Sequence, residues 1–238
     1  LQIRNTVISR ISSNQGYIEV TLKHSGSLML WSGQQRFYSK NSTQNVVTAV
    51  GEILLRQHFA RAWNTDVPNN DTVTVTDTNI DTAQQNFKEC SDYIEKHRLT
   101  LSFEVVPSIL GHHGDLPKRD YMILIAVADR KREKFYSTAE LTAFAQQFRL
   151  PHNDAWLFHT TDGVRNLFHL YDSMRETGVA STVIRALDKA ADGGVVKSMY
   201  PHSIFQGEIL EGIVIRYVSY DAPGQSDDGT NIGVIHRV

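Results

Sequence analysis

Apolar and polar residues alternate along residues 16–22, "GYIEVTL", in the period-two pattern of a half-buried β-strand. Residues 26–33 and 35–40 predict two further short strands, and residues 99–106, "LTLSFEVV", predict another. Residues 120–129 are apolar nearly throughout, which indicates a strand buried on both faces. Residues 155–160 and 207–220 complete the predicted strands, which therefore cluster toward the two ends of the chain.

Helical spacing appears between these strands. Apolar residues recur every three or four positions along residues 45–63, and further helices are predicted at residues 83–97, 165–175 and 180–191. A capping box from Ser137 to Glu140 opens a helix that runs to Phe148. Residues 64–85 are rich in Asn, Asp and Thr, so we expect a long surface loop there. The pattern predicts an α+β fold, rich in antiparallel strands with helices inserted between them, over a single domain of residues 1–238.

Composition narrows the function classes. The 238 residues are 41% hydrophobic with a net charge of −2, which is typical of a globular protein that exerts no global attraction on nucleic acid. The single cysteine, Cys90, excludes an internal disulfide and a cysteine-based zinc site. No apolar run is long enough to cross a membrane and no signal peptide is recognisable. We therefore expect an intracellular protein with no membrane partner, in the nucleus, the cytoplasm or an organelle.

Familiar nucleotide and metal motifs are absent from the sequence. There is no G-x-x-x-x-G-K-[ST] loop, no G-x-G-x-x-G and no H-E-x-x-H, which disfavours P-loop kinases, Rossmann dehydrogenases and zinc proteases. His112 and His113 with Asp115 are a weak metal candidate, and polar surface explains them more simply. The same holds for two basic runs, at residues 118–119 and 130–134, as nucleic-acid contacts.

Lys23 raises a sharper question, because it stands between two predicted strands in "KHSG". A free lysine has a pKa of about 10.4, so only about one in 2,500 is neutral at pH 7. A lysine nucleophile therefore needs a nearby cation or partial desolvation to lose its proton. Leu22 and the apolar run after Gly26 flank Lys23, and Lys40 is the candidate cation. Taken by itself, however, Lys23 also fits a solvated lysine at a strand end.

Other residues suited to phosphoryl transfer follow Lys23 in a defined order. "SKNS" occupies residues 39–42, Glu104 lies within a predicted strand, and Glu211-Gly212 opens the last one. This order resembles that of the covalent nucleotidyltransferases, the superfamily of polynucleotide ligases and RNA capping enzymes. Its first motif is K-x-x-G, its third places a glutamate on a strand and its fourth begins E-G; Lys23, Glu104 and Glu211 match these motifs.

Longer stretches narrow the resemblance. "SKNS" resembles the RNA ligase 1-like branch of the superfamily. Within that branch, "KHSGSLMLW", "GHHGDLP", "FRLPHNDAWLF" and "GEILEGIV" are similar to the plant-type tRNA ligases. The resemblance covers residues 16–220 and implies the ATP-grasp-like nucleotidyltransferase fold of ligases.

The resemblance also implies a three-step reaction with ATP and Mg²⁺. ATP adenylylates Lys23, AMP passes to an RNA 5′-phosphate, and a 3′-hydroxyl then expels AMP and joins cleaved tRNA exon halves. Glu211 is the expected metal ligand, and Glu104 is expected near the ribose or the metal. The expected ATP-binding residues are Lys23, Gly26, Lys40, Glu104 and Glu211.

The residues that contact RNA or its phosphates are less defined. Candidates are Arg36, Ser39, Asn41, Ser42 and Arg216, and Arg36, Lys40 or Arg216 is expected to read a 2′-phosphate. Tyr121 and Phe135 are candidates to stack on adenine, with core packing the simpler explanation for Tyr121.

The chain departs from the superfamily at its fifth motif, K-x-K, because no lysine follows Lys197. We expect an excerpt truncated at both ends, with kinase and cyclic phosphodiesterase domains in the same full-length chain. An inactive RNA-binding module of the same fold stays open as an alternative. A DNA ligase and a capping enzyme also stay open, although "SKNS" argues against both.

Overall fold

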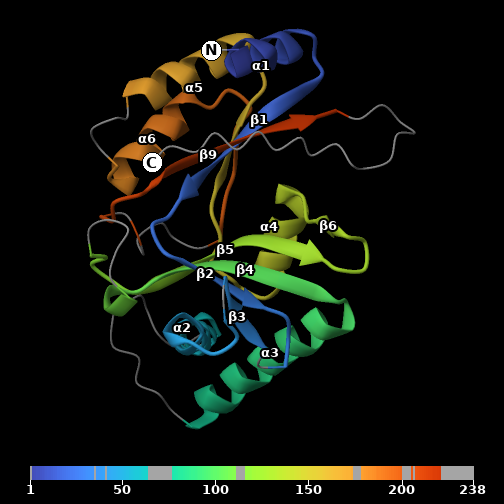
Figure 1. The fold of residues 1–238 in the computed structure, drawn as a ribbon, viewed down its shortest axis with the longest axis vertical. Helices are drawn as coiled ribbons and strands as arrows, with labels where there is room; N and C mark the ends of the chain where they lie inside the picture. The colour runs from blue at the N-terminus through green and yellow to red at the C-terminus, as the bar shows by residue number, and fades with distance from the viewer. Residues whose placement is uncertain are drawn as a thin grey trace. The chain divides into compact units, whose positions relative to one another are not determined.

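The computed structural model describes residues 2–34, 36–40, 42–63, 77–110, 116–173, 178–199, 205 and 207–220 (Figure 1). The chain divides into two compact units. Unit 1 comprises Leu1–Ser25, Asn153–Lys197 and Phe205–Val238, and unit 2 comprises Gly26–His152 and Ser198–Ile204. Each unit contains one antiparallel sheet, and each carries some of the predicted site residues.

Unit 1 is built on a four-stranded sheet with the order β8-β7-β1-β9. Its strands are β1 (Gly16–Lys23), β7 (Ala155–Phe158), β8 (Val195–Val196) and β9 (Gly212–Ser219). Its helices are α1 (Gln2–Ser12), α5 (Thr161–Ser173) and α6 (Ala180–Ala190), which lie beside one another in Figure 1. β1 pairs with β7 on one side and β9 on the other, so it is an interior strand.

Strand β1 has one apolar and one polar face because successive side chains point to opposite sides of a sheet. Ile18, Val20 and Leu22 are at most 2% exposed and form the core face. The alternate positions, Glu19 and Lys23 among them, share the other face. The pattern that predicted the strand therefore also predicts which residues belong to the core and which to the polar face.

Unit 2 contains a five-stranded sheet with the order β3-β2-β4-β5-β6. Its strands are β2 (Ser27–Trp31), β3 (Phe37–Ser39), β4 (Leu99–Val106), β5 (Tyr121–Asp129) and β6 (Lys134–Phe135). Its helices are α2 (Val46–Ala62), α3 (Asp77–Lys96), α4 (Thr138–Gln147) and the short 3-10 helix η1 (Ser108–Leu110). Trp31, Leu55, Phe59 and Phe103 are among the fully buried side chains that join the helices to the sheet in one core.

The predicted α+β class with antiparallel sheets is confirmed. The capping box of α4 is also confirmed, because the Ser137 side chain accepts from the Glu140 backbone and Glu140 accepts from the Ser137 backbone. Within the part of the chain that is described, no helix is both long and apolar enough to span a bilayer.

Two helix starts differ from the prediction, and one helix was not predicted. Helix α3 begins at Asp77, so residues 77–85 are helical rather than part of the expected loop, and residues 64–76 lie outside the described ones. Ala83, Phe87, Cys90 and Ile94 are buried at helical spacing, and this packing overrides the loop-like composition. Helix α5 begins at Thr161 rather than 165, and α1 was not predicted.

Candidate functional site

Lys23 is the last residue of β1, and its position is fixed by the pairing of β1 with β9. Lys23 lies opposite Gly212, and the Glu211 backbone N–H donates to the Lys23 carbonyl at 2.9 Å. The Nζ of Lys23 contacts Oε1 of Glu211 in an ion pair, and the two side chains are 23% and 31% exposed. The predicted nucleophile and the predicted metal-binding carboxylate are therefore brought together in unit 1.

Two polar residues, the buried His24 and the half-buried Asn153, hold the chain on either side of Lys23. Nε2 of His24, which is 3% exposed, lies 2.9 Å from Oδ1 of Asn153. The amide nitrogen of Asn153 donates to the carbonyl of Leu22 at 3.0 Å. The His24 ring also meets Phe205 edge-on, with 5.0 Å between ring centroids. His24 and Asn153 were not predicted as site residues, although both lie within stretches that carry the family resemblance, "KHSG" and "PHND".

Arg216 lies opposite Glu19 across the same pair of strands. The two-residue period places both on the face of the sheet that carries Lys23. Burial lowers the pKa of Arg216, and the charge of Glu19 opposes that shift. Tyr17 donates to Glu19 at 3.2 Å, and burial, followed by the Glu19 charge, raises the pKa of Tyr17 to about 12. This polar face of unit 1 therefore carries two cations and a carboxylate that is largely shielded from water.

Gly26 and Glu104 meet in unit 2, where β2 pairs with β4. The backbone N–H of Gly26 donates to Oε1 of Glu104 at 3.0 Å. A Cβ at position 26 would lie 2.4 Å from the carbonyl oxygen of Val105, closer than such atoms approach. The glycine of "KHSG" is thus required by the approach of a neighbouring strand, and Glu104 has a partner within the motif.

Ser39 and Ser42, the first and last residues of "SKNS", are bonded to one another before α2 begins. The Ser39 backbone N–H and hydroxyl both donate to the Ser42 carbonyl, at 2.7 and 3.1 Å, and Asn45 donates to the Ser39 hydroxyl at 2.6 Å. Lys40 is exposed, and Asn41 lies outside the described residues. These bonds thus join the residues that flank the exposed Lys40 in the motif.

Arg36 is exposed and pairs with Glu95 at 3.3 Å, which gives it a structural partner in unit 2. Of the two aromatic candidates, Tyr121 is 4% exposed in the core, whereas Phe135 is 62% exposed on the edge strand β6. These burials favour core packing for Tyr121 and leave Phe135 accessible.

Metal ligands do not cluster in the described part of the chain, where no three His, Cys, Asp or Glu side chains gather around one point. His112, His113 and Asp115 lie outside the described residues. Among the described residues, the carboxylate in contact with Lys23 is that of Glu211.

Comparison with known proteins agrees with the sequence resemblance. The chain is 39% identical over 221 residues to tRNA ligase 1 of Arabidopsis thaliana. This match covers 92% of the chain but only 18% of the relative. It confirms the predicted resemblance to plant-type tRNA ligases. No protein-family model matches the chain.

Solved structures give weaker matches. A lysine-to-alanine variant of Naegleria gruberi RNA ligase with ATP and Mn aligns with a TM-score of 0.49 and 14% identity, over 91% of this chain and 51% of that one. The same ligase with PPi aligns with a TM-score of 0.49 and 14% identity, over 89% and 50%. Similarity this low carries no argument about the chemistry of the site.

Proposed function

From the similarity to a plant tRNA ligase over nine-tenths of the chain, we propose that this chain supplies the nucleotidyltransferase part of an ATP-dependent RNA ligase. The full protein joins cleaved tRNA exon halves through a lysyl-AMP intermediate. The ion pair between Lys23 and Glu211 is the observation that carries this proposal. It links the lysine of one short motif to the carboxylate of another, 188 positions away.

In the first step, the Nζ of Lys23 attacks the α-phosphorus of ATP. A P–N bond forms and pyrophosphate leaves. Nζ must first pass a proton to water, and its ion pair with Glu211 must break so that the nitrogen lone pair can face the phosphorus. The ladder between β1 and β9 holds the lysine backbone still, which supplies the positioning on which phosphoryl transfer depends.

In the second and third steps, AMP passes to an RNA 5′-phosphate and a 3′-hydroxyl then displaces it. Arg216 is a candidate for a phosphate contact in these steps because it shares the polar face of Lys23. Lys40 is a candidate because it is exposed to solvent. Glu104 is assigned to the ribose hydroxyls or to orientation of the "KHSG" backbone that it already contacts.

Mg²⁺ fits this set of donors. The ion usually takes one or two protein carboxylates and completes its coordination with substrate phosphates and water. Glu211 would hold it beside Lys23, where it would neutralise phosphate charge as the leaving group departs.

The partners and compartment follow from the same proposal. RNA and ATP are the substrates, and the cell interior, in the nucleus or cytoplasm, is the proposed location. Because the chain spans only 18% of its relative, kinase and cyclic phosphodiesterase domains are proposed for the remainder of the full-length protein.

The test is covalent labelling of the full-length protein with ATP labelled at the α-phosphate, in the presence of Mg²⁺. Wild type is expected to retain AMP, and Lys23→Ala to retain none. Lys189→Ala is the matched control, because Lys189 is an exposed lysine of the same unit, on α6. Labelling of Lys23→Ala at the wild-type level would refute the assignment, and labelling by GTP instead of ATP would favour a capping enzyme.

A second candidate is an RNA-binding module without catalysis. Residues 198–238 contain no lysine that could serve as the fifth motif, so this module stays the alternative for the chain as given. For the same reason we expect residues 1–238, produced as an isolated chain, to label much more weakly than the full-length protein. Equal labelling of the two would show that the fifth motif is dispensable.

A further inference from the structure

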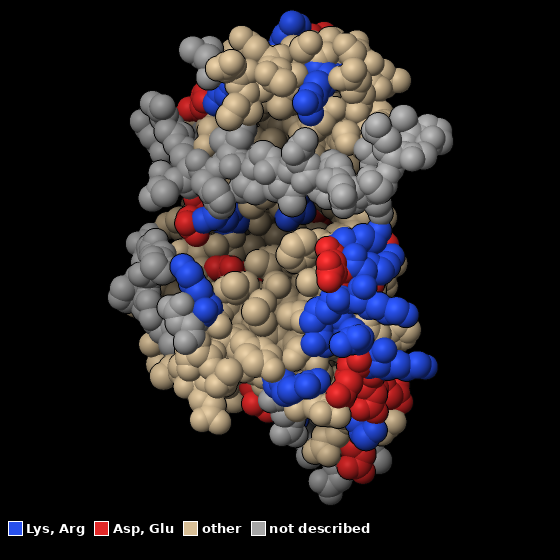
Figure 2. Space-filling view, turned by 45° about the vertical axis from the view of Figure 1, so that its right-hand side comes forward, with Lys and Arg blue, Asp and Glu red and all other residues tan. Residues whose placement is uncertain are grey.

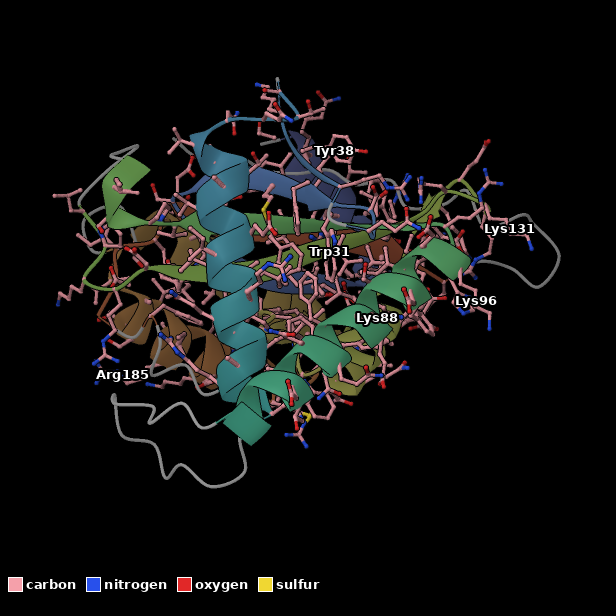
Figure 3. All side chains as sticks on the ribbon, turned by 90° about the horizontal axis from the view of Figure 1, so that it is seen from below. Trp31, Tyr38, Lys88, Lys96, Lys131 and Arg185 are labelled. Atoms are coloured by element: carbon pink, nitrogen blue, oxygen red, sulfur yellow. The ribbon has the colours of Figure 1, made fainter. Side chains whose placement is uncertain are left out.

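A hollow of about 410 Å³ opens in unit 2, where the end of α3 meets the turn between β5 and β6. We call it the basic hollow. Its lining residues are Lys96, His97, Asp129, Lys131, Arg132 and Tyr136. Figure 2 shows Lys and Arg side chains gathered over this part of unit 2. Figure 3 labels Lys96 at the end of α3 and Lys131 near it.

Two of these cations are available to a ligand. Arg132 is occupied, because its Nε donates to Asp129 at 2.5 Å and its Nη1 lies 3.7 Å from Glu140. Lys96 and Lys131 are exposed, and neither forms an ion pair with another described residue. The hollow therefore has a local positive charge although the whole chain has a net charge of −2.

Hydrogen bonds fix the backbone of the two segments that carry these cations. Asp129 accepts from the backbone N–H groups of Lys131 and Arg132, both at 2.9 Å, and the charge and hydrogen bonds of Arg132 lower the pKa of Asp129. The backbone and side chain of Arg130 donate to the carbonyl of Arg98 at 3.0 and 3.1 Å. These bonds tie the turn after β5 to the residues that follow α3, so Lys96 and Lys131 are held at one location.

Aromatic rings accompany the charge. The His97 ring stacks on Tyr93 with 4.1 Å between centroids, and Tyr136 lines the hollow. His97 is exposed and lines the hollow itself, whereas Phe135 pairs with Ala128 and lies on the opposite face of β6 from the lining residue Tyr136. Cationic side chains beside exposed rings suit a nucleic-acid strand, because phosphates meet the cations and bases stack on the rings.

We propose that the basic hollow binds the phosphate backbone of the RNA substrate through Lys96 and Lys131, while a base stacks on the exposed ring of His97. This inference rests on the proposed function for the identity of the nucleic acid. It adds an RNA contact surface to unit 2 that none of the nucleotidyltransferase motifs contains. An anionic membrane is the rival partner for the same charges.

The test measures binding of single-stranded RNA to the full-length protein over a range of salt concentrations. Each phosphate contact to a single strand contributes about 0.7 to the slope of log affinity against log salt, so Lys96→Ala/Lys131→Ala should reduce that slope by about 1.4. His97→Ala should weaken binding roughly tenfold and leave the slope unchanged, and Phe135→Ala, on the other face of β6, should change neither.

Two controls remove exposed cations outside the hollow. Lys88→Ala alters the same helix α3, but Lys88 is already paired with Asp92 at 2.6 Å, and Arg185→Ala alters α6 of unit 1 (Figure 3). Both should keep the wild-type slope. An unchanged slope in the double variant would overturn the proposal, and so would an equal loss in the controls or a loss of binding to anionic vesicles without a loss for RNA.

Covalent AMP labelling of the same variants separates this inference from the proposed function. Normal labelling with an unchanged salt slope would refute the basic hollow alone. Absence of labelling in wild type, with RNA binding that still depends on Lys96 and Lys131, would refute the ligase proposal and support the RNA surface.

Discussion

At the scale of single residues, Gly26 is a position in the predicted site where the structure leaves no room for a side chain. A Cβ there would lie 2.4 Å from the Val105 carbonyl oxygen and 2.8 Å from a methyl group of Val106. Gly26→Ala should therefore push β2 away from β4 and lower the free energy of unfolding by about 1–3 kcal/mol. Urea denaturation measures this loss, and lysyl-AMP labelling should fall as well because the contact with Glu104 is disturbed.

Ser25→Ala is the control for Gly26→Ala, since it alters the adjacent position and adds no atom. It should unfold close to the wild-type urea midpoint. Wild-type stability of Gly26→Ala would show that the strands separate at no cost, contrary to the packing described here.

At the scale of elements, hydrogen bonds join the C-terminal part of α2 to Arg149, which follows α4. Nε2 of His58 lies 2.6 Å from the Arg149 carbonyl, and the Arg149 guanidinium donates to the Ala62 carbonyl at 2.8 Å while lying over the Trp63 ring. Burial, with a smaller contribution from the charge of Arg61, lowers the pKa of His58 from 6.5 to about 4. The folded protein therefore holds His58 neutral.

The lowered pKa of His58 should make the free energy of unfolding depend on pH. Because the folded-state pKa of His58 is lowered, its contribution is complete above pH 6.5 and is lost as the pH falls from 6.5 to about 4, where the unfolded chain binds the proton first. His58→Gln should unfold with a smaller pH dependence in that window. Urea midpoints of both proteins across it provide the measurement, and parallel curves would contradict the role of His58.

Element prediction from sequence succeeded where burial follows a local period. The alternation of β4 matches its buried positions, and the capping box of α4 is a short-range signal. It failed for α1, where Ile3, Val7 and Ile11 are spaced by four residues but only Ile11 is buried, so the apolar stripe is weak. It failed at the start of α3 because Asn, Asp and Thr there resemble a loop.

The site was predicted only in part for a related reason. Motif order identified Lys23 and Glu211, but their contact depends on the register of two strands far apart in the chain. No local period encodes that register. The contact between His24 and Asn153 was not predicted because a polar pair follows no hydrophobic pattern, and the two residues are 129 positions apart in the chain.

At the scale of the whole molecule, the two units differ in how the chain builds them. Residues 26–152 contain all five strands of the unit 2 sheet and every residue of its core cluster. We expect this fragment to fold by itself, with a cooperative urea transition and the circular dichroism of a mixed α/β protein. Residues 153–238 lack β1, which pairs with both β7 and β9, and should remain unfolded.

Adding a peptide of residues 1–25 to the second fragment is the matched test. The peptide restores the interior strand, so a gain of ordered structure on mixing is expected. A folded fragment of residues 153–238 without the peptide would contradict the sheet order as the basis of unit 1.

The interior position of β1 also determines the order in which the two units can fold during translation. Unit 2 can begin to form once His152 has been added, but the sheet around β1 is complete only after Ser219. At about 5–20 residues per second, translation of that interval takes roughly 3 to 13 s. The segment carrying Lys23 is translated before its partner strands β7 and β9, so the lysine meets Glu211 only near the end of translation of this region.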